Sequence, residues 1–103
     1  MLFHLSLVHD GAHCPGFHPE LMSKTFGAFE KREEIARRHN VKIHSYLIAA
    51  PEHLEILIVD AETPMSVAFF LSELYPFELA QIDMKAVQSI EDMMAMARER
   101  FGR

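Results

Sequence analysis

The 103-residue sequence is poor in cysteine, glycine and tryptophan, with one, four and none of them. A single cysteine cannot form a disulfide within the chain, which favours a reducing compartment. No apolar run approaches the roughly 20 residues that a membrane-spanning helix needs. The N-terminal residues MLFHLSLVHD also lack the basic segment of a signal peptide. We therefore expect a cytoplasmic protein without a membrane span.

The sequence also lacks a surplus of positive charge. Its 10 Lys and Arg against 15 Asp and Glu give a formal net charge of -5. Nucleic-acid binding without sequence preference needs a basic face, and the basic cluster at residues 31–38 is interleaved with glutamates. Nucleic acid is therefore not an expected partner. The hydrophobic share of 50% and charged share of 24% are typical of one folded domain over residues 1–103.

Apolar periodicity and turn residues predict seven elements in the order β-α-β-β-α-β-α. Strands are expected at residues 2–9, 41–50, 53–61 and within 77–87, and helices at about 19–39, from 64 and from 89 onward. Asn40 should end the first helix in a left-handed conformation. Thr63 and Ser89 should cap the later helices, and Pro76 should stop the second one. The apolar side of the last helix should pack in a core or an interface.

This element order predicts an α+β fold of the ferredoxin-like, or split βαβ, kind. Its four-stranded antiparallel sheet has the order 4-1-3-2, two helices on one face, and here an extra C-terminal helix. In order and length of elements, nearly the whole chain resembles the dimeric ferredoxin-like α/β-barrel proteins, and among them the small GYD-type domains. Pro51-Glu52-His53-Leu54 stands where GYD-type proteins have Gly-Glu-Tyr-Asp, and shares the glutamate. The resemblance implies a homodimer whose two sheets enclose a cavity, which larger relatives use for haem, aromatic substrates or metal-free oxygen chemistry.

Alternation along each strand assigns its side chains to the two sheet faces. The helix-facing residues should be Phe3, Leu5, Leu7, Val41, Ile43, Leu47, Leu54, Ile56 and Ile58. The open face should then combine His4, Ser6, Lys42, His44, Tyr46, His53 and Glu55 with Val8, Ile48, Leu57 and Val59. A mixed face of this kind fits a wet homodimer interface or a small-ligand pocket. All of these polar residues except Lys42 are candidate ligand-binding residues.

The loop after the first strand concentrates residue types that Zn²⁺ or a related divalent ion accepts, namely His9, Asp10, His13, Cys14 and His18. The turns at Asp10-Gly11 and Pro15-Gly16 could fold the loop back on itself. Glu52 or His53 could add a ligand, because the end of the first strand lies beside the start of the third in an antiparallel pair. The spacing matches no standard metal motif. A polar loop that caps the first helix and a reactive Cys14 thiol are the alternatives.

Three functions stay open, since no phosphate loop, catalytic triad or zinc-protease motif is present. The first is a homodimeric module that binds or senses a small ligand, with or without a divalent metal such as zinc. The second is a cofactor-light enzyme of monooxygenase or isomerase type. In it Glu55 or His44 would abstract a proton and Tyr46, hydrogen-bonded to Glu55 across the hairpin, would orient the substrate. The third is a purely structural dimerisation role, which a flat and fully packed interface would indicate.

Overall fold

The computed structural model describes residues 1–74 and 80–102, apart from the side chain of His13. Its strands β1 (Leu2–Val8), β2 (Lys42–Ala49), β3 (Leu54–Asp60) and β4 (Gln81–Val87) form one antiparallel sheet. The sheet order is β2-β3-β1-β4, which is 4-1-3-2 counted from the other edge, as the sequence predicted. The helices are α1 (Pro19–Glu30), α2 (Arg32–Arg38), α3 (Pro64–Leu74) and α4 (Ile90–Phe101). The α+β class is therefore confirmed.

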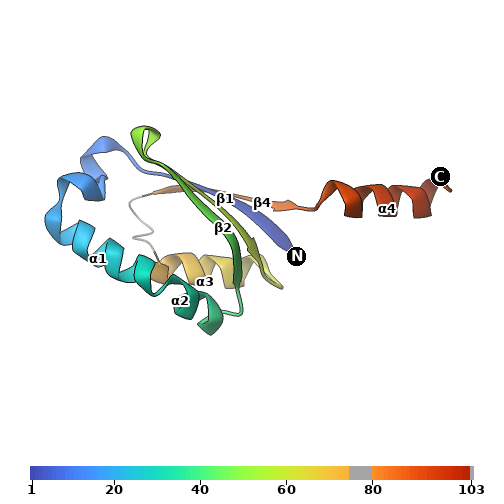
Figure 1. The fold of residues 1–103 in the computed structure, drawn as a ribbon, viewed down its shortest axis with the longest axis horizontal. Coiled ribbons are helices and arrows are strands. Elements are labelled where there is room, and N and C mark those ends of the chain that lie inside the picture. The colour runs from blue at the N-terminus through green and yellow to red at the C-terminus, as the bar shows by residue number, and fades with distance from the viewer. Residues whose placement is uncertain (75–79, 103) are drawn as a thin grey trace.

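The core fills the space between one face of the sheet and the helices α1, α2 and α3, which all lie on that side (Figure 1). On β1 the alternation is as expected, because Phe3, Leu5 and Leu7 are buried. On α3 the buried residues recur every three or four positions, as Val67, Phe70, Leu71 and Leu74. In the part of the chain that the structure describes, no helix lies over the opposite face of the sheet (Figure 1).

The prediction of one continuous first helix over residues 19–39 was wrong, because the structure has two helices there, α1 and α2. The chain leaves the helical conformation at Lys31, with φ -97° and ψ 9°, and Arg32 Nη1 donates to the Phe29 carbonyl at 2.8 Å. The break changes the direction of the chain, so that α2 can bury Ile35 and Ala36 while α1 diverges from the sheet. No proline or glycine at the break announces it.

The predicted helix ends and caps are confirmed at every such position among the described residues. Asn40 is left-handed, with φ 56°, and Thr63 Oγ1 accepts from the Ser66 amide at 3.2 Å. Ser89 accepts from the Asp92 amide at 3.0 Å. Pro76, and residues 77–79 of the expected fourth strand, lie outside the described residues.

The face assignment of β3 was wrong. Glu55, Leu57 and Val59 are buried under the helices, in register with the core residues of β1. Leu54, Ile56 and Ile58 lie on the open face instead. The physical reason is that both faces of LEILIV are apolar except for Glu55, so hydrophobicity does not distinguish them. A shift of one residue then exchanges the two faces completely.

The faces of β2 also differ from the expectation, because the pairing with β3 shifts between Ile43 and Ser45. The extra residue, His44, forms a bulge and reverses the alternation after it. Tyr46 and Ile48 therefore join Ile43 on the covered face, and Leu47 points to the open face.

Helix α4 extends away from the rest of the chain (Figure 1). The radius of gyration is 16.0 Å, whereas a compact chain of this length has about 13 Å. The large apolar side chains of α4 are exposed and do not join the core. They are Ile90, Met93, Met94, Met96 and Phe101. None of the helices in the described part of the chain has the length and apolar character needed to cross a membrane.

Candidate functional site

A cavity of about 220 Å³ lies between α1 and the β2–β3 hairpin, beside the loop that follows β1. Most of its wall is apolar, with Met22, Phe26 and Phe29 from α1 and Ile48 and Leu54 from the hairpin. Its polar wall residues are His9, Cys14, Thr25, His53 and Glu55. An apolar pocket with a few convergent polar groups is the usual form of a small-ligand site.

Three residues of this wall form a cluster that we call the His–Cys–His cluster: His9, Cys14 and His53. One ligand-type atom of each lies within 4.8 Å of the other two, and all three residues are half-buried. His9 directly follows β1 and His53 directly precedes β3. The His9 amide donates to the His53 carbonyl at 3.2 Å, which extends the antiparallel pairing by one residue and holds the two side chains together.

The two histidine rings of the cluster meet edge to face. Their centroids are 5.0 Å apart with an interplanar angle of 67°. His9 Nε2 and His53 Nδ1 face each other at 3.3 Å. Burial lowers the pKa of His9, the nearby His53 lowers it further, and the charge of Asp10 opposes the shift. His9 is therefore biased towards the neutral form, which is the form that binds metals.

His53 occupies a backbone conformation that few side chains adopt. It ends the 3₁₀ turn η3 (Ala50–Glu52) with φ 54° and ψ 41°, in the left-handed region. Glycine is favoured there, because a Cβ atom is crowded by the backbone. The conformation aims the His53 ring back towards the end of β1, where His9 lies.

Glu55 forms the polar floor of the cavity. It is only 4% exposed, and the Tyr46 hydroxyl donates a hydrogen bond to its Oε1. Burial raises the pKa of Glu55, and the hydrogen bond from Tyr46 partly opposes that rise. The expected Tyr46–Glu55 contact is thus confirmed, although on the covered face of the sheet and not on the open one. Phe29 packs edge to face on Tyr46 at 5.7 Å and shields the pair.

Thr25 carries the one buried side-chain oxygen or nitrogen without a hydrogen-bond partner among the described residues. Its side chain is 3% exposed and lies on α1, in the cavity wall. Residue type alone does not mark Thr25 as a site residue. Its position three residues after Met22 and four before Phe29 could have placed it on the inner side of the helix.

Of the five candidate metal ligands in the loop, the structure brings two together, His9 and Cys14. His18 is not in the cluster, since its Nε2 lies 2.7 Å from the Ala12 carbonyl. Asp10 is exposed, outside the cluster, and its charge opposes the lowering of the His9 pKa. The side chain of His13 lies outside the described residues. The third member, His53, comes from the hairpin, as the antiparallel pairing of the strands allowed.

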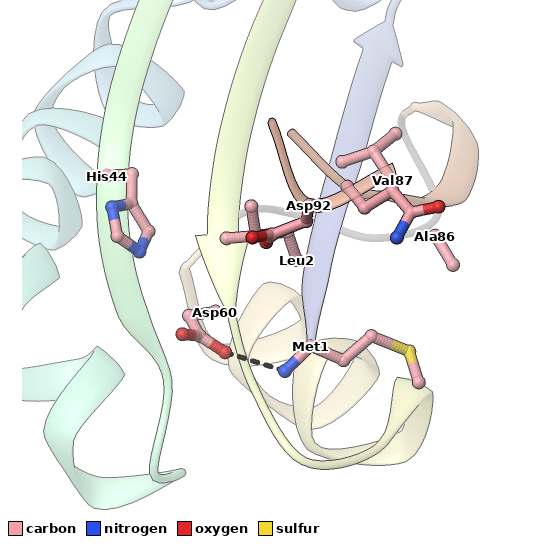
Figure 2. A pocket seen from close by; sticks show the side chains of 8 residues that line it. Met1, Leu2, His44, Asp60, Ala86, Val87 and Asp92 are labelled. Carbon is pink, nitrogen blue, oxygen red and sulfur yellow. Dashed lines mark hydrogen bonds and ion pairs between the residues drawn. The ribbon is translucent and has the colours of Figure 1, made fainter. Parts of the chain in front are cut away.

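The six candidate ligand-binding residues do not form one pocket. His4 and Ser6 are on the open face, whereas Tyr46 and Glu55 are under the helices and His53 is in the cluster. His44 borders a separate hollow on the open side, near the start of α4 (Figure 2). There Asp60 Oδ1 accepts a hydrogen bond from the Met1 amino group at 2.8 Å.

Comparison of the chain with protein-family models and with curated proteins found no match.

Proposed function

We propose that this protein is a small-ligand-binding or sensing module, and that its ligand occupies the cavity between α1 and the β2–β3 hairpin. The observation that carries the proposal is the unpartnered Thr25 hydroxyl, buried in a wall that is otherwise mostly apolar. A buried hydroxyl without a hydrogen bond destabilises a fold by about 1–3 kcal/mol. A ligand that reached this buried hydroxyl, after a small movement of the side chains that cover it, would supply the missing partner and recover that free energy.

The wall also indicates the chemistry of the ligand. Met22, Phe26 and Ile48 offer an apolar surface, and Thr25 and Glu55 offer hydrogen-bonding groups at the same cavity. The Glu55 carboxylate accepts hydrogen bonds when it is ionised. The wall therefore fits a small, mainly apolar molecule that carries one hydroxyl or N–H donor.

A suitable probe is 2-naphthol, which has a flat apolar body and a single hydroxyl. Ile48 and Leu47 allow a matched pair of variants, because they are adjacent, 58% and 62% exposed, and on opposite sheet faces. We expect calorimetry to show saturable 1:1 binding by the unmodified chain and by Leu47→Trp. Ile48→Trp, which fills the cavity, should weaken binding at least tenfold. Absence of saturable binding, or equal weakening by both variants, would contradict the proposal.

A catalytic version of the same site is favoured by one observation, the raised pKa of Glu55 in the cavity wall. Burial that raises the pKa of a carboxylate makes it a stronger base, which suits a general base. The ring opening of 5-nitrobenzisoxazole tests this, because it requires only the abstraction of one carbon-bound proton. An enzyme of this type should accelerate the reaction and lose the acceleration in Glu55→Gln. If the chain binds 2-naphthol without accelerating this reaction, the binding role stands alone.

The fold and its open face support a homodimer of the ferredoxin-like, dimeric α/β-barrel type. The element order and the 4-1-3-2 sheet are those of the ferredoxin-like arrangement. In the described part of the chain, the open face presents Leu47, Ile56 and Ile58 with no helix over it, and α4 presents exposed apolar side chains that do not join the core. Large exposed apolar surfaces typically become interfaces. A second copy would supply both partners at once, a sheet for α4 and a cover for the open face.

A further inference from the structure

We propose that His9, Cys14 and His53 bind a divalent transition-metal ion of the zinc class, with a fourth coordination position open to the cavity. The three-residue centre rests on its own geometry. Only the use of the open position by a ligand rests on the function proposed above, so the two can fail separately.

The distance between the two histidine nitrogens matches a metal site. Nitrogen atoms bound to one tetrahedral zinc ion at about 2.0–2.1 Å lie roughly 3.3–3.4 Å apart. His9 Nε2 and His53 Nδ1 are 3.3 Å apart. A neutral histidine pair also reaches this separation through a hydrogen bond, so the third group is needed to distinguish the two arrangements.

Cys14 supplies that third group. Its sulfur lies within 4.8 Å of one ring nitrogen of each histidine, whereas a tetrahedral zinc ion would hold nitrogen and sulfur roughly 3.6 Å apart. A shift of about 1 Å in the sulfur closes this gap, which a small change in one side-chain torsion provides. Cys14 is half-buried and has no disulfide. The hydrogen bond from the Phe17 amide to the Cys14 carbonyl, 3.0 Å, closes the turn that begins at Cys14.

The left-handed backbone of His53 fixes the direction of its side chain. A left-handed position is most easily filled by glycine, yet the chain has histidine there. Sparsely populated backbone conformations cluster at ligand sites, where a side chain must be aimed in a particular direction. Here the direction is towards His9, which is anchored to the same residue by the 3.2 Å backbone hydrogen bond.

The donor set determines the class of metal. Two imidazoles and one thiolate suit zinc, cobalt, nickel or copper, whereas magnesium and calcium prefer oxygen ligands. Three protein ligands leave one position of a tetrahedral ion free, as in catalytic zinc sites. All three donors line the cavity wall. A molecule in the cavity could therefore contribute the fourth ligand.

Cobalt(II) is the probe for the test, because its visible absorption reports coordination geometry. The full chain, purified without a histidine tag, is titrated with Co²⁺ under reducing conditions. We expect one equivalent to give the intense visible bands of tetrahedral cobalt and a near-ultraviolet sulfur-to-cobalt band. One equivalent of Zn²⁺ should abolish both. Proton release on binding should accompany the titration, since the thiolate must form.

Variants locate the ion. Cys14→Ser should remove the sulfur band, and His9→Gln and His53→Gly should each weaken Co²⁺ binding at least tenfold. His4→Gln is the matched control, because His4 is a half-buried histidine on the opposite sheet face, and it should bind Co²⁺ as the unmodified chain does. Far-ultraviolet circular dichroism of each metal-free variant establishes that the fold is retained. The inference is overturned if no stoichiometric band forms, or if the bands persist in both Cys14→Ser and His53→Gly.

A second titration separates the metal from the cavity. The cobalt-loaded chain is mixed with 4-phenylimidazole, which joins a donor nitrogen to an apolar ring, and with imidazole alone. Use of the open position within the cavity predicts a spectral change at lower concentration for 4-phenylimidazole, and Ile48→Trp should remove that preference. Equal responses to the two probes would leave the metal centre in place and overturn its opening into the cavity. A chain that binds no Co²⁺ but still binds 2-naphthol would retain the proposed function and overturn the metal centre alone.

Discussion

The Tyr46 hydroxyl donates a hydrogen bond to Glu55 across the hairpin, from a strand position that lies opposite Leu57 and not opposite Glu55 itself. The contact is diagonal, and a long aromatic side chain can span it. Because the pair is covered by Phe29 and the helices, its free energy depends on the charge of one buried carboxyl group.

The first prediction is that Tyr46→Phe destabilises the fold in a pH-dependent way. Burial raises the pKa of Glu55 in the folded state, so stability falls as the pH rises from the ordinary glutamate range through that raised pKa. Loss of the Tyr46 donor raises the pKa of Glu55 further and deepens this fall. Denaturant unfolding should give a loss of about 1.5–3 kcal/mol at pH 8 and about 1 kcal/mol at pH 4.

Glu55→Gln is the matched control for that series. Its amide oxygen still accepts from Tyr46, but the group no longer titrates, so the part of the pH dependence caused by Glu55 should disappear. A Tyr46→Phe variant equally destabilised at both pH values would show that packing alone is lost.

The second prediction concerns Thr25. In Thr25→Val a methyl group replaces the unpartnered buried hydroxyl at nearly the same volume. The free energy of unfolding should rise by about 1 kcal/mol, while the affinity for 2-naphthol should fall. Thr63→Val provides a contrast, because Thr63 accepts from the Ser66 amide at the start of α3, and its loss should cost about 1 kcal/mol. A destabilised Thr25→Val would mean that its hydroxyl is satisfied in solution.

The sequence was sufficient for the order of elements, and for β1 in detail, because β1 alternates apolar residues with His4 and Ser6. It was insufficient for β3, where apolar residues fill both faces and only Glu55 differs. A lone glutamate is normally exposed, so the expectation that Glu55 lies on the open face was reasonable but wrong. The bulge at His44 then moved Tyr46 to the same side, so the predicted contact formed although both face assignments were wrong.

For the candidate site, residue type and strand pairing identified His9, Cys14 and His53 as candidates. Residue type and strand pairing could not distinguish this cluster from Asp10 or His18, because the loop conformation decides which side chains turn inward. The cavity itself was not predictable, because it lies beside α1, whose course relative to the sheet follows a helix break at Lys31. Neither proline nor glycine signals that break.

The third prediction is that zinc stabilises the chain through His53. At a free Zn²⁺ concentration 100 times its dissociation constant, the free energy of unfolding should rise by about 2.7 kcal/mol. His53→Gly should abolish this response, yet be at least as stable without metal, because glycine relieves the left-handed backbone. Asn40→Gly relieves the other left-handed non-glycine position in the described chain and should keep the full response to zinc. A zinc response that survives in His53→Gly would place the ion elsewhere.

The last prediction is that the open sheet face mediates dimerisation. Sedimentation equilibrium at micromolar concentration should give about twice the 11.8 kDa chain mass. Leu47→Lys, on the open face and 62% exposed, should raise the dissociation constant at least tenfold, because the interface would bury an unpaired charge.

Phe69→Lys, on α3 and 54% exposed, removes similar apolar surface away from that face and should leave association unchanged. Met93→Glu on α4 should act like Leu47→Lys if the projecting helix joins the same interface. A monomeric unmodified chain, or equal effects of Leu47→Lys and Phe69→Lys, would rule out this interface.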